Sequence, residues 1–213
     1  MKTIYLVRHG ETHANIKRVW QDATDELSPK GLQQAEDVAQ RLSTLKIDFA
    51  LTSSMKRAVQ TADVIGKKTG ISFLESPFFV EVSVPTSTVG TTYEEVEGNA
   101  GFEYVATRDL HADDPDYRYE DEETLNELIE RIKAGLAYLD SLPAQNILVV
   151  THGTILRSLI SLVMHQELLV TPYTIFTAGR RLETMNTSIS VLHKKPDALW
   201  SVITFNDYAH FAE

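Results

Sequence analysis

The chain has 213 residues, 43% of them hydrophobic, which is enough to fill one substantial core. It contains no cysteine, so a disulfide framework, a thiolate nucleophile and a cysteine-ligated metal are all excluded. The formal net charge of -10 at pH 7 disfavours sequence-independent binding to nucleic acid and to anionic membranes. We therefore expect one soluble domain in a reducing compartment, without nucleic-acid or membrane partners.

The first residues carry no targeting pattern. Met1 to Leu6 holds a single Lys before a short apolar run, and charged residues follow directly. Such a segment fits neither a signal peptide nor a transmembrane helix. The sequence thus predicts a cytoplasmic protein.

Strand-like and helix-like segments alternate along most of the chain. Short apolar or alternating runs predict strands at 3–7, 48–52, 71–74, 146–150, 188–192 and 199–205. Segments with apolar residues at helical spacing predict helices at 28–45, 54–68, 124–142 and 154–164. Alternating strands and helices favour a mostly parallel sheet covered on both faces. We expect a single three-layer α/β domain over residues 1–213.

The first long helix has the clearest local signals. Ser28 supplies an N-cap and Pro29 a first-turn proline. The apolar positions of this segment recur at helical spacing, which supports the helix: Leu32, Ala35, Val38, Ala39 and Leu42.

One stretch lacks a sustained period. Between the third strand and the helix that begins near Thr124, the chain is rich in Gly, Thr, Pro and acidic residues. Long segments without secondary structure of their own are often functional. We therefore expect an insertion or lid at about 82–120, which would also set specificity.

Two segments share one arrangement that points to chemistry. Arg8-His9-Gly10 follows the first predicted strand, and Thr151-His152-Gly153 follows the fourth. Carboxyl ends of strands in open α/β sheets are where ligands bind, so the two histidines can converge over one pocket. A glycine beside each histidine lets the backbone approach a ligand and expose its N–H, which suits a bound anion.

The motifs resemble those of the histidine phosphatase superfamily, the phosphoglycerate mutase-like proteins. The segment Leu-Val-Arg-His-Gly-Glu-Thr at 6–12, followed by Asn15, resembles the signature motif of this superfamily. Further blocks occur in the family's order at 27–35, 52–62, 149–153 and 186–190, whereas about 81–123 has no clear counterpart. The resemblance implies a phosphoglycerate mutase-like fold and a small phosphorylated substrate.

The chemistry of these residues agrees with that implication. Neighbouring guanidinium groups disfavour a protonated imidazole, so His9 can be the neutral nucleophile that attacks phosphorus. Arg8 and Arg57 can present bidentate donors to the phosphoryl oxygens, and His152 completes this clamp.

Other residues are assigned to substrate binding or proton transfer. Gly10 and Gly153 are expected to bind phosphate through the backbone. Thr12 and Asn15 can either cap the next turn or reach the phosphate. A leaving alkoxide needs a proton, and Glu81, after an apolar run, is the candidate general acid. The substitutes for it are Glu94, Glu95 and Glu97.

Neither a metal nor a cofactor is expected. No two histidines fall at a ligand-like helical spacing, and phosphate chemistry better explains His9 with His152.

The favoured function is a metal-independent phosphomonoester hydrolase that works through phosphohistidine on His9. One alternative is a phosphoglycerate mutase, which would shield the same intermediate from water. The acidic insertion and the few residues after Phe205 disfavour it. Another alternative is a non-catalytic phosphate-binding module on the same fold. The natural substrate and the oligomeric state stay open, a homodimer being one option.

Overall fold

The protein is built around one six-stranded sheet, with strand order β3-β2-β4-β1-β5-β6. The structure, a computed structural model, describes residues 1–92, 107, 110–111, 113–166, 168 and 170–211. The strands are β1 (Lys2–Arg8), β2 (Phe49–Thr52), β3 (Leu74–Glu75), β4 (Asn146–Thr151), β5 (Ile189–Lys194) and β6 (Trp200–Asp207). The pairings among β1, β2, β3 and β4 are parallel, whereas β5 and β6 join antiparallel. The predicted single, mostly parallel α/β domain is confirmed.

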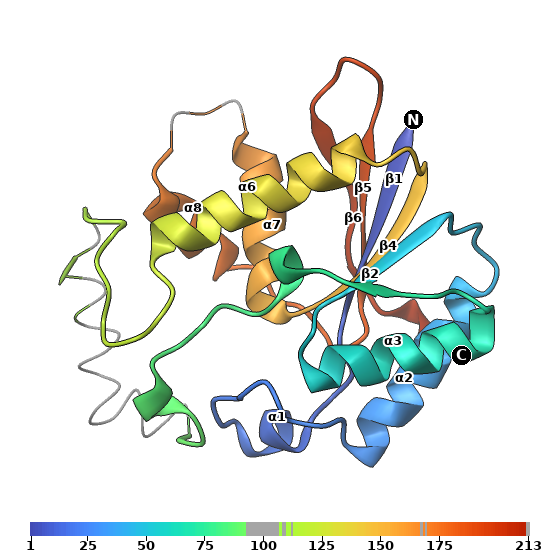
Figure 1. Cartoon of the computed structure of the whole chain (residues 1–213), viewed down its shortest axis with the longest axis horizontal. Helices are drawn as coiled ribbons and strands as arrows, with labels where there is room; N and C mark the ends of the chain where they lie inside the picture. The colour runs from blue at the N-terminus through green and yellow to red at the C-terminus, as the bar shows by residue number, and fades with distance from the viewer. Residues whose placement is uncertain (93–106, 108–109, 112, 167, 169, 212–213) are drawn as a thin grey trace.

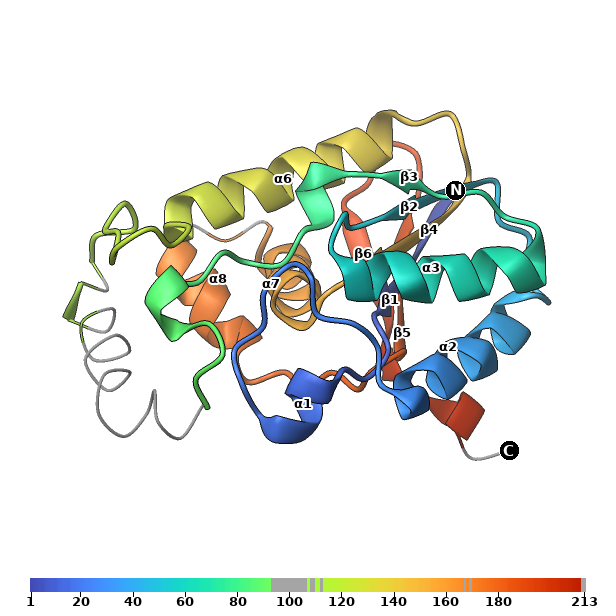
Figure 2. The same ribbon diagram turned by 60° about the horizontal axis from the view of Figure 1, so that its bottom comes forward.

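Helices cover both faces of this sheet (Figures 1 and 2). One face carries α2 (Pro29–Leu42) and α3 (Lys56–Thr69), which pack against each other. The other face carries α6 (Leu125–Ser141), α7 (Gly153–His165) and α8 (Pro172–Gly179). The remaining described helical segments are short: α1 (His13–Lys17) and the 3₁₀ turns η1 (Pro77–Phe79), η2 (Thr86–Thr88) and η3 (Ala209–Phe211).

Two apolar cores lie on opposite faces of the sheet. Ile147 and Val149 of β4 pack into the core under α6 and α7, whereas Leu148 and Val150 pack into the core under α2 and α3. Successive residues of a strand point to opposite faces, so a strand buried on both sides must be apolar throughout. This is why the central strands stand out in the sequence as continuous apolar runs.

Two of the predicted helix starts, at Ser28 and Thr124, are confirmed in detail. The Ser28 hydroxyl accepts from the N–H of Gly31 at 3.0 Å, and Pro29 occupies the first turn of α2. Thr124 forms a capping box with Glu127 at the start of α6. Of the five apolar residues at helical spacing in α2, four are buried and Leu32 is 44% exposed.

Other details differ from the sequence-based expectation. The third strand was predicted at 71–74, but β3 pairs only at Leu74–Glu75, because only Leu51 and Thr52 of β2 lie beside it. The sequence patterns did not indicate α1 or α8, which are only five and eight residues long.

The proposed insertion at about 82–120 lies partly outside the described residues. Its described beginning is hydrogen-bonded to the loop after α1: the Trp20 N–H donates to Thr91, and the Gly90 N–H donates to Trp20, both at 2.9 Å. The chain just after this segment is hydrogen-bonded to its beginning, since the Glu123 N–H donates to the Ser83 carbonyl at 2.9 Å. Within the described part of the chain, no helix is long and apolar enough to cross a membrane.

Candidate active site

Three neighbouring strands deliver the central polar side chains to one edge of the sheet. In the parallel register Arg8 of β1 lies opposite Thr151 of β4, and Val150 of β4 lies opposite Thr52 of β2. The residues that follow directly are therefore adjacent in space: His9, His152 and Ser53. The two imidazole rings lie 5.1 Å apart, centroid to centroid. The convergence predicted from the two His-Gly segments is what the structure shows.

The His9 side chain is buried, with 3% exposure, and its orientation is fixed by a neighbouring carbonyl. Nδ1 lies 2.7 Å from the carbonyl oxygen of Gly10. A carbonyl only accepts, so Nδ1 carries the proton and Nε2 keeps its lone pair. Burial lowers the pKa of His9 well below 6.5, and the guanidinium groups of Arg57 and Arg8 lower it further. His9 is thus a neutral imidazole with its Nε2 nucleophilic.

His152 is fully buried beside His9. Its Nε2 lies 2.7 Å from the hydroxyl of Ser53, whereas its Nδ1 is buried without a hydrogen-bond partner among the described residues. Burial is the main cause that lowers the pKa of His152 well below 6.5, followed by the repulsion that a protonated His9 would exert and by the charges of Arg57 and Arg8. Both histidines of the site are therefore neutral near pH 7.

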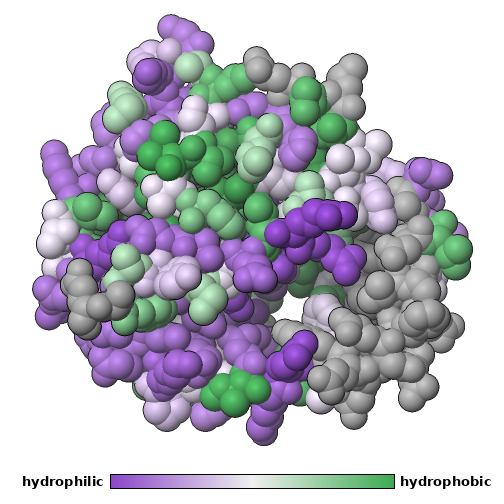
Figure 3. Space-filling model, turned by 180° about the vertical axis from the view of Figure 1, so that it is seen from behind, coloured by the Kyte–Doolittle hydropathy of each residue, from purple (hydrophilic) through white to green (hydrophobic). Residues whose placement is uncertain are grey.

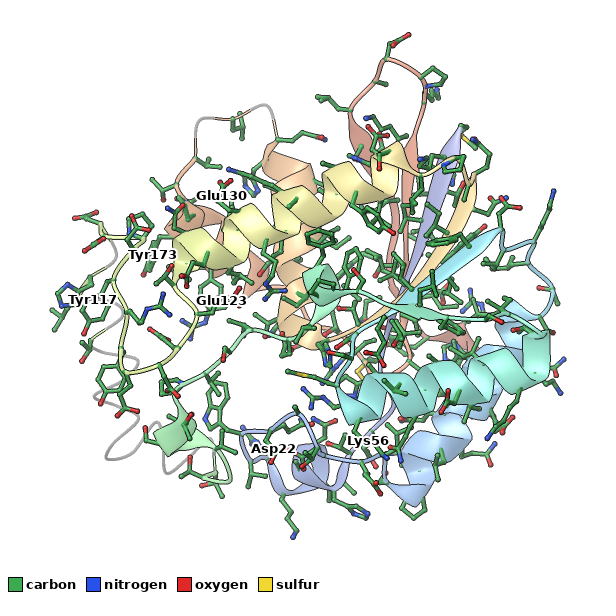
Figure 4. All side chains as sticks on the ribbon, in the orientation of Figure 1. Asp22, Lys56, Tyr117, Glu123, Glu130 and Tyr173 are labelled. Atoms are coloured by element: carbon green, nitrogen blue, oxygen red, sulfur yellow. The ribbon has the colours of Figure 1, made fainter. Side chains whose placement is uncertain are left out.

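Two arginines from different elements reach the same edge. Arg57 comes from the first turn of α3 and is 2% exposed, and its Nη1 donates to the carbonyl of Asp22 at 2.6 Å. Figure 4 shows Asp22 on the loop that follows α1. Arg8 ends β1, and its Nη1 donates to the carbonyl of Thr184. These backbone acceptors hold both guanidinium groups in place beside His9.

The two glycines of the His-Gly segments have different surroundings. A Cβ on Gly10 would lie 2.5 Å from the carbonyl oxygen of Gly31, so only glycine fits this contact with the start of α2. Gly10 does not line the pocket described below. Gly153 does line it, and a Cβ there would meet the Arg8 guanidinium at 3.4 Å.

Thr12 and Asn15 together cap α1. The Asn15 N–H donates to the Thr12 hydroxyl at 3.0 Å, and the Asn15 side chain accepts from the Thr12 N–H at 3.1 Å. Thr12 is fully buried and lies outside the pocket lining, whereas Asn15 lines the pocket. Of the two roles considered for this pair, the structure shows the cap directly, and contact with the phosphate stays a prediction.

Glu81 lies across the pocket at the start of α7. Its Oε2 accepts from the N–H of Thr154 at 3.0 Å and its Oε1 from the N–H of Ile155 at 3.3 Å. The side chain lines the pocket and is half-buried. Its position is thus fixed by backbone donors at a helix N-terminus rather than by deep burial. The alternative carboxylates Glu94, Glu95 and Glu97 lie outside the described residues.

An arginine of α6 holds the segment that leads into Glu81. Nη1 of Arg131 donates to the carbonyls of Phe78 and Val80 at 3.0 and 2.9 Å. The same guanidinium makes a two-pronged contact with the Glu123 carboxylate, 2.7 Å for each hydrogen bond. Since both side chains are largely buried, this pair fastens the Glu81 segment to α6.

Arg8, His9, Arg57 and Glu81 line one pocket of about 620 Å³, whereas His152 is not among its lining residues. Arg8, His9 and Arg57 line its inner end. Side chains that the sequence did not single out line the rest, among them Trp20, Arg157, Tyr173, Phe176 and Arg180. In Figure 4, Tyr173 lies on α8, across the open side of the molecule from Asp22. Figure 3 shows, from behind, a hollow with hydrophilic side chains along part of its border.

The arginines make this pocket cationic although the chain as a whole is acidic. Among the described residues, four guanidinium groups line it, from Arg8, Arg57, Arg157 and Arg180, against the two carboxylates Glu81 and Glu183. Gly179 lets α8 approach the backbone of Arg157 on α7, where a Cβ would lie 3.2 Å from the Arg157 carbonyl oxygen.

The described residues contain no group of three or more His, Asp or Glu side chains that could hold a metal ion. The metal-independent mechanism stays a prediction.

Comparisons with known proteins agree with this geometry. Over residues 4–208 the chain matches the model of the histidine phosphatase superfamily, branch 1. It is 34% identical to "Probable phosphoglycerate mutase GpmB" of Cronobacter sakazakii, covering 99% of this chain and 95% of the relative. It is 30% identical to "Uncharacterized phosphatase PhoE" of Bacillus subtilis, covering 76% of this chain and 77% of the relative.

Solved structures share the fold. Bacillus stearothermophilus YhfR superposes with a TM-score of 0.81 at 21% identity, over 99% of both chains. The mycobacterial glucosyl-3-phosphoglycerate phosphatase superposes with a TM-score of 0.76 at 20% identity, over 97% of this chain and 100% of that one. The family match over nearly the whole length, together with the two histidines at adjacent strand ends, shows that the chain belongs to the histidine phosphatase superfamily, branch 1.

Proposed function

We propose that the protein hydrolyses small phosphomonoesters through a phosphohistidine on His9. The observation that carries this proposal is the state of His9: a buried, neutral imidazole with Nδ1 bound to a carbonyl and Nε2 free to attack. Arg8 and Arg57 lie beside it, so the nucleophile and the donors for a phosphoryl group are already together.

The first step forms the Nε2–phosphorus bond and breaks the ester P–O bond. Arg8 and Arg57 stabilise the charge on the phosphoryl oxygens during this transfer. Glu81 in its protonated form gives its proton to the leaving oxygen, so the product departs as an alcohol. His152 contacts the phosphoryl group from the neighbouring strand end.

The second step returns the enzyme to its starting state. Water attacks phosphorus, the P–N bond breaks, and the Glu81 carboxylate takes the proton of the water. Phosphate leaves, and Glu81 is again protonated. One carboxyl group thus serves first as the acid and then as the base. It can do both only if the attacking water takes the place that the leaving oxygen has vacated. We assign this role to Glu81 because it lines the pocket and is held at the start of α7.

The outer pocket selects the organic part of the substrate. Val82 and Val84, from the described beginning of the proposed insertion, line it together with residues of α8. Because this wall mixes aromatic rings with Arg157 and Arg180, it suits a small anionic metabolite.

The experiment is to trap the intermediate. The enzyme is mixed with a labelled phosphomonoester, quenched in base during turnover, and digested for peptide mapping. We expect acid-labile phosphate on His9 and none in the His9→Ala variant, which should also lose turnover. Label on His152, or near-normal turnover by His9→Ala, would contradict the proposed nucleophile.

A mutase is the second candidate, because 34% identical relatives bear that name. The two activities differ in the acceptor of the phosphoryl group. Incubation with 3-phosphoglycerate separates them: a phosphatase releases inorganic phosphate and glycerate, whereas a mutase forms 2-phosphoglycerate with little release. We expect release to dominate. Dominant isomerisation would instead support the mutase.

A further inference from the structure

We propose that Ser53 is a positioning residue that holds His152 as its Nδ1–H tautomer, so that Nδ1 donates a hydrogen bond to the phosphoryl group. This inference rests on the proposed function for the identity of the acceptor. The tautomer itself can be tested without turnover.

The sheet places the three residues in a row. The strand order β2-β4-β1 puts the end of β4 between the ends of the other two. Backbone hydrogen bonds fix this alignment: the Ser53 N–H donates to Val150 at 3.0 Å, and the His9 N–H donates to Thr151 at 2.9 Å. His152 therefore has Ser53 on one side and His9 on the other.

Counting protons on the Ser53 hydroxyl assigns the donor. Oγ accepts from the N–H of Met55 at 3.2 Å and lies 2.7 Å from Nε2 of His152. These are its contacts among the described residues, and both side chains are fully buried. If Nε2 carried the proton, the buried serine O–H would be left without an acceptor, which costs about 1–3 kcal/mol. The serine therefore donates to Nε2.

The single proton of His152 must then sit on Nδ1. The ring is neutral near pH 7, because burial and the neighbouring cations disfavour a second proton. Nδ1 is buried and has no partner among the described residues, so its N–H is a donor held for a ligand. The His9 ring is 5.1 Å away, so a phosphoryl group on His9 lies within reach of that N–H.

This assignment also explains why a serine is needed. A free histidine side chain in water favours the opposite tautomer, with the proton on Nε2. An outside hydrogen bond must therefore hold the less favoured form. The same device occurs in His9, where the carbonyl of Gly10 fixes the proton on Nδ1. The two histidines are thus held as the same tautomer by different groups. A carbonyl that accepts from Nδ1 holds His9, and a hydroxyl that donates to Nε2 holds His152.

The direct test is NMR of the whole protein with ¹⁵N-labelled histidine at neutral pH. Two-bond ¹H–¹⁵N correlations distinguish the tautomers, and the His152 signals are assigned by their loss in a His152→Gln variant. We expect the proton on Nδ1 of His152. A proton on Nε2 overturns the proposal, whatever the activity of the enzyme.

Ser53→Ala tests the role of the hydroxyl, with Ser54→Ala as the matched control because Ser54 is adjacent but exposed. We expect Ser53→Ala to move His152 toward the Nε2–H form and to lower kcat by about tenfold or more, with KM changed less. Ser54→Ala should match the wild type in both measurements. An unchanged tautomer in Ser53→Ala refutes the positioning role.

Failure of the proposed function would be visible separately. A wild-type protein that shows the Nδ1–H form but hydrolyses no phosphomonoester keeps the tautomer assignment and loses the phosphatase. A wild-type protein that hydrolyses phosphomonoesters but has His152 in the Nε2–H form keeps the proposed function and loses the tautomer assignment.

Discussion

Two buried neutral histidines should make the fold sensitive to mild acid. The pKa values of His9 and His152 are lowered well below 6.5, burial being the largest cause for each, whereas in the unfolded chain both return to the ordinary value. Between the folded and the unfolded pKa, only the unfolded state binds these two protons. Stability therefore falls as pH decreases below about 6.5, and the effect is absent above it.

The size of this loss of stability follows from the linkage between proton binding and unfolding. At about pH 5.5, one unit below the ordinary value, each histidine costs roughly 1.4 kcal/mol of unfolding free energy, and the pair about 2.8 kcal/mol. Natural domains have only about 5–15 kcal/mol in total. The loss should thus be large enough to measure by urea denaturation.

The assay compares the wild type with a His9→Gln, His152→Gln double variant at about pH 7.5 and 5.5. All other titrating groups are shared, so their effects cancel in the difference between the two proteins. The wild type should lose about 2–3 kcal/mol more than the variant on acidification, and each single variant about half of that. Equal losses in wild type and double variant would mean that the histidines are not held neutral by the fold, and the argument for a neutral nucleophile would fail with it.

Four further outcomes are expected. Glu81→Gln should slow hydrolysis of esters with poor leaving groups by about 10²–10⁴-fold and barely affect those with good ones, because only a basic alkoxide needs a proton; equal slowing for both classes would exclude it as general acid. EDTA should leave activity intact, and loss restored by one divalent ion would contradict the histidine and arginine mechanism. Exchanging about 82–120 for the same segment of a related phosphatase should change the substrate ranking measured with a metabolite panel, and an unchanged ranking would count against its role in specificity. Gly10→Ala should destabilise the fold by more than about 1 kcal/mol in urea, since its Cβ would lie 2.5 Å from the Gly31 carbonyl oxygen; wild-type stability would show that the two segments can separate.

The sheet and its main helices were predictable because their signals are local. The β1 and β4 strands are continuous apolar runs, and Ser28 and Thr124 are helix caps that depend on neighbours only three residues away. The edge strand β3 was misplaced because its pairing depends on β2, which is remote in the sequence. Leu32 shows the same limit: it recurs at the helical spacing of the buried residues, yet it is 44% exposed.

The candidate site divides in the same way. His9, His152, Arg8 and Arg57 sit in motifs whose context points to phosphate, and the structure brings them together. Ser53 lies in one of those motifs, but its contact with His152 spans 99 residues and follows only from the strand order.

The outer wall of the pocket was beyond sequence reasoning for another reason. Tyr173 and Phe176 belong to a short helix without a strong pattern, and Arg180 directly follows it. All three line the pocket where Gly179 lets α8 pack closely on α7. Such tertiary contacts leave no periodic trace in the sequence.

The alignment of Ser53, His152 and His9 on adjacent strands also bears on how the protein can open. Their positions are fixed by backbone bonds in the middle of the sheet, so separating them requires breaking the sheet itself. The opposite wall, from residues 82–92 and α8, is attached through loops and a short helix. In native-state hydrogen exchange we expect the amides of β1 and β4 to exchange only through global unfolding, and those of α8 through smaller, local openings. Substrate and product could then pass while the phosphate end keeps its geometry.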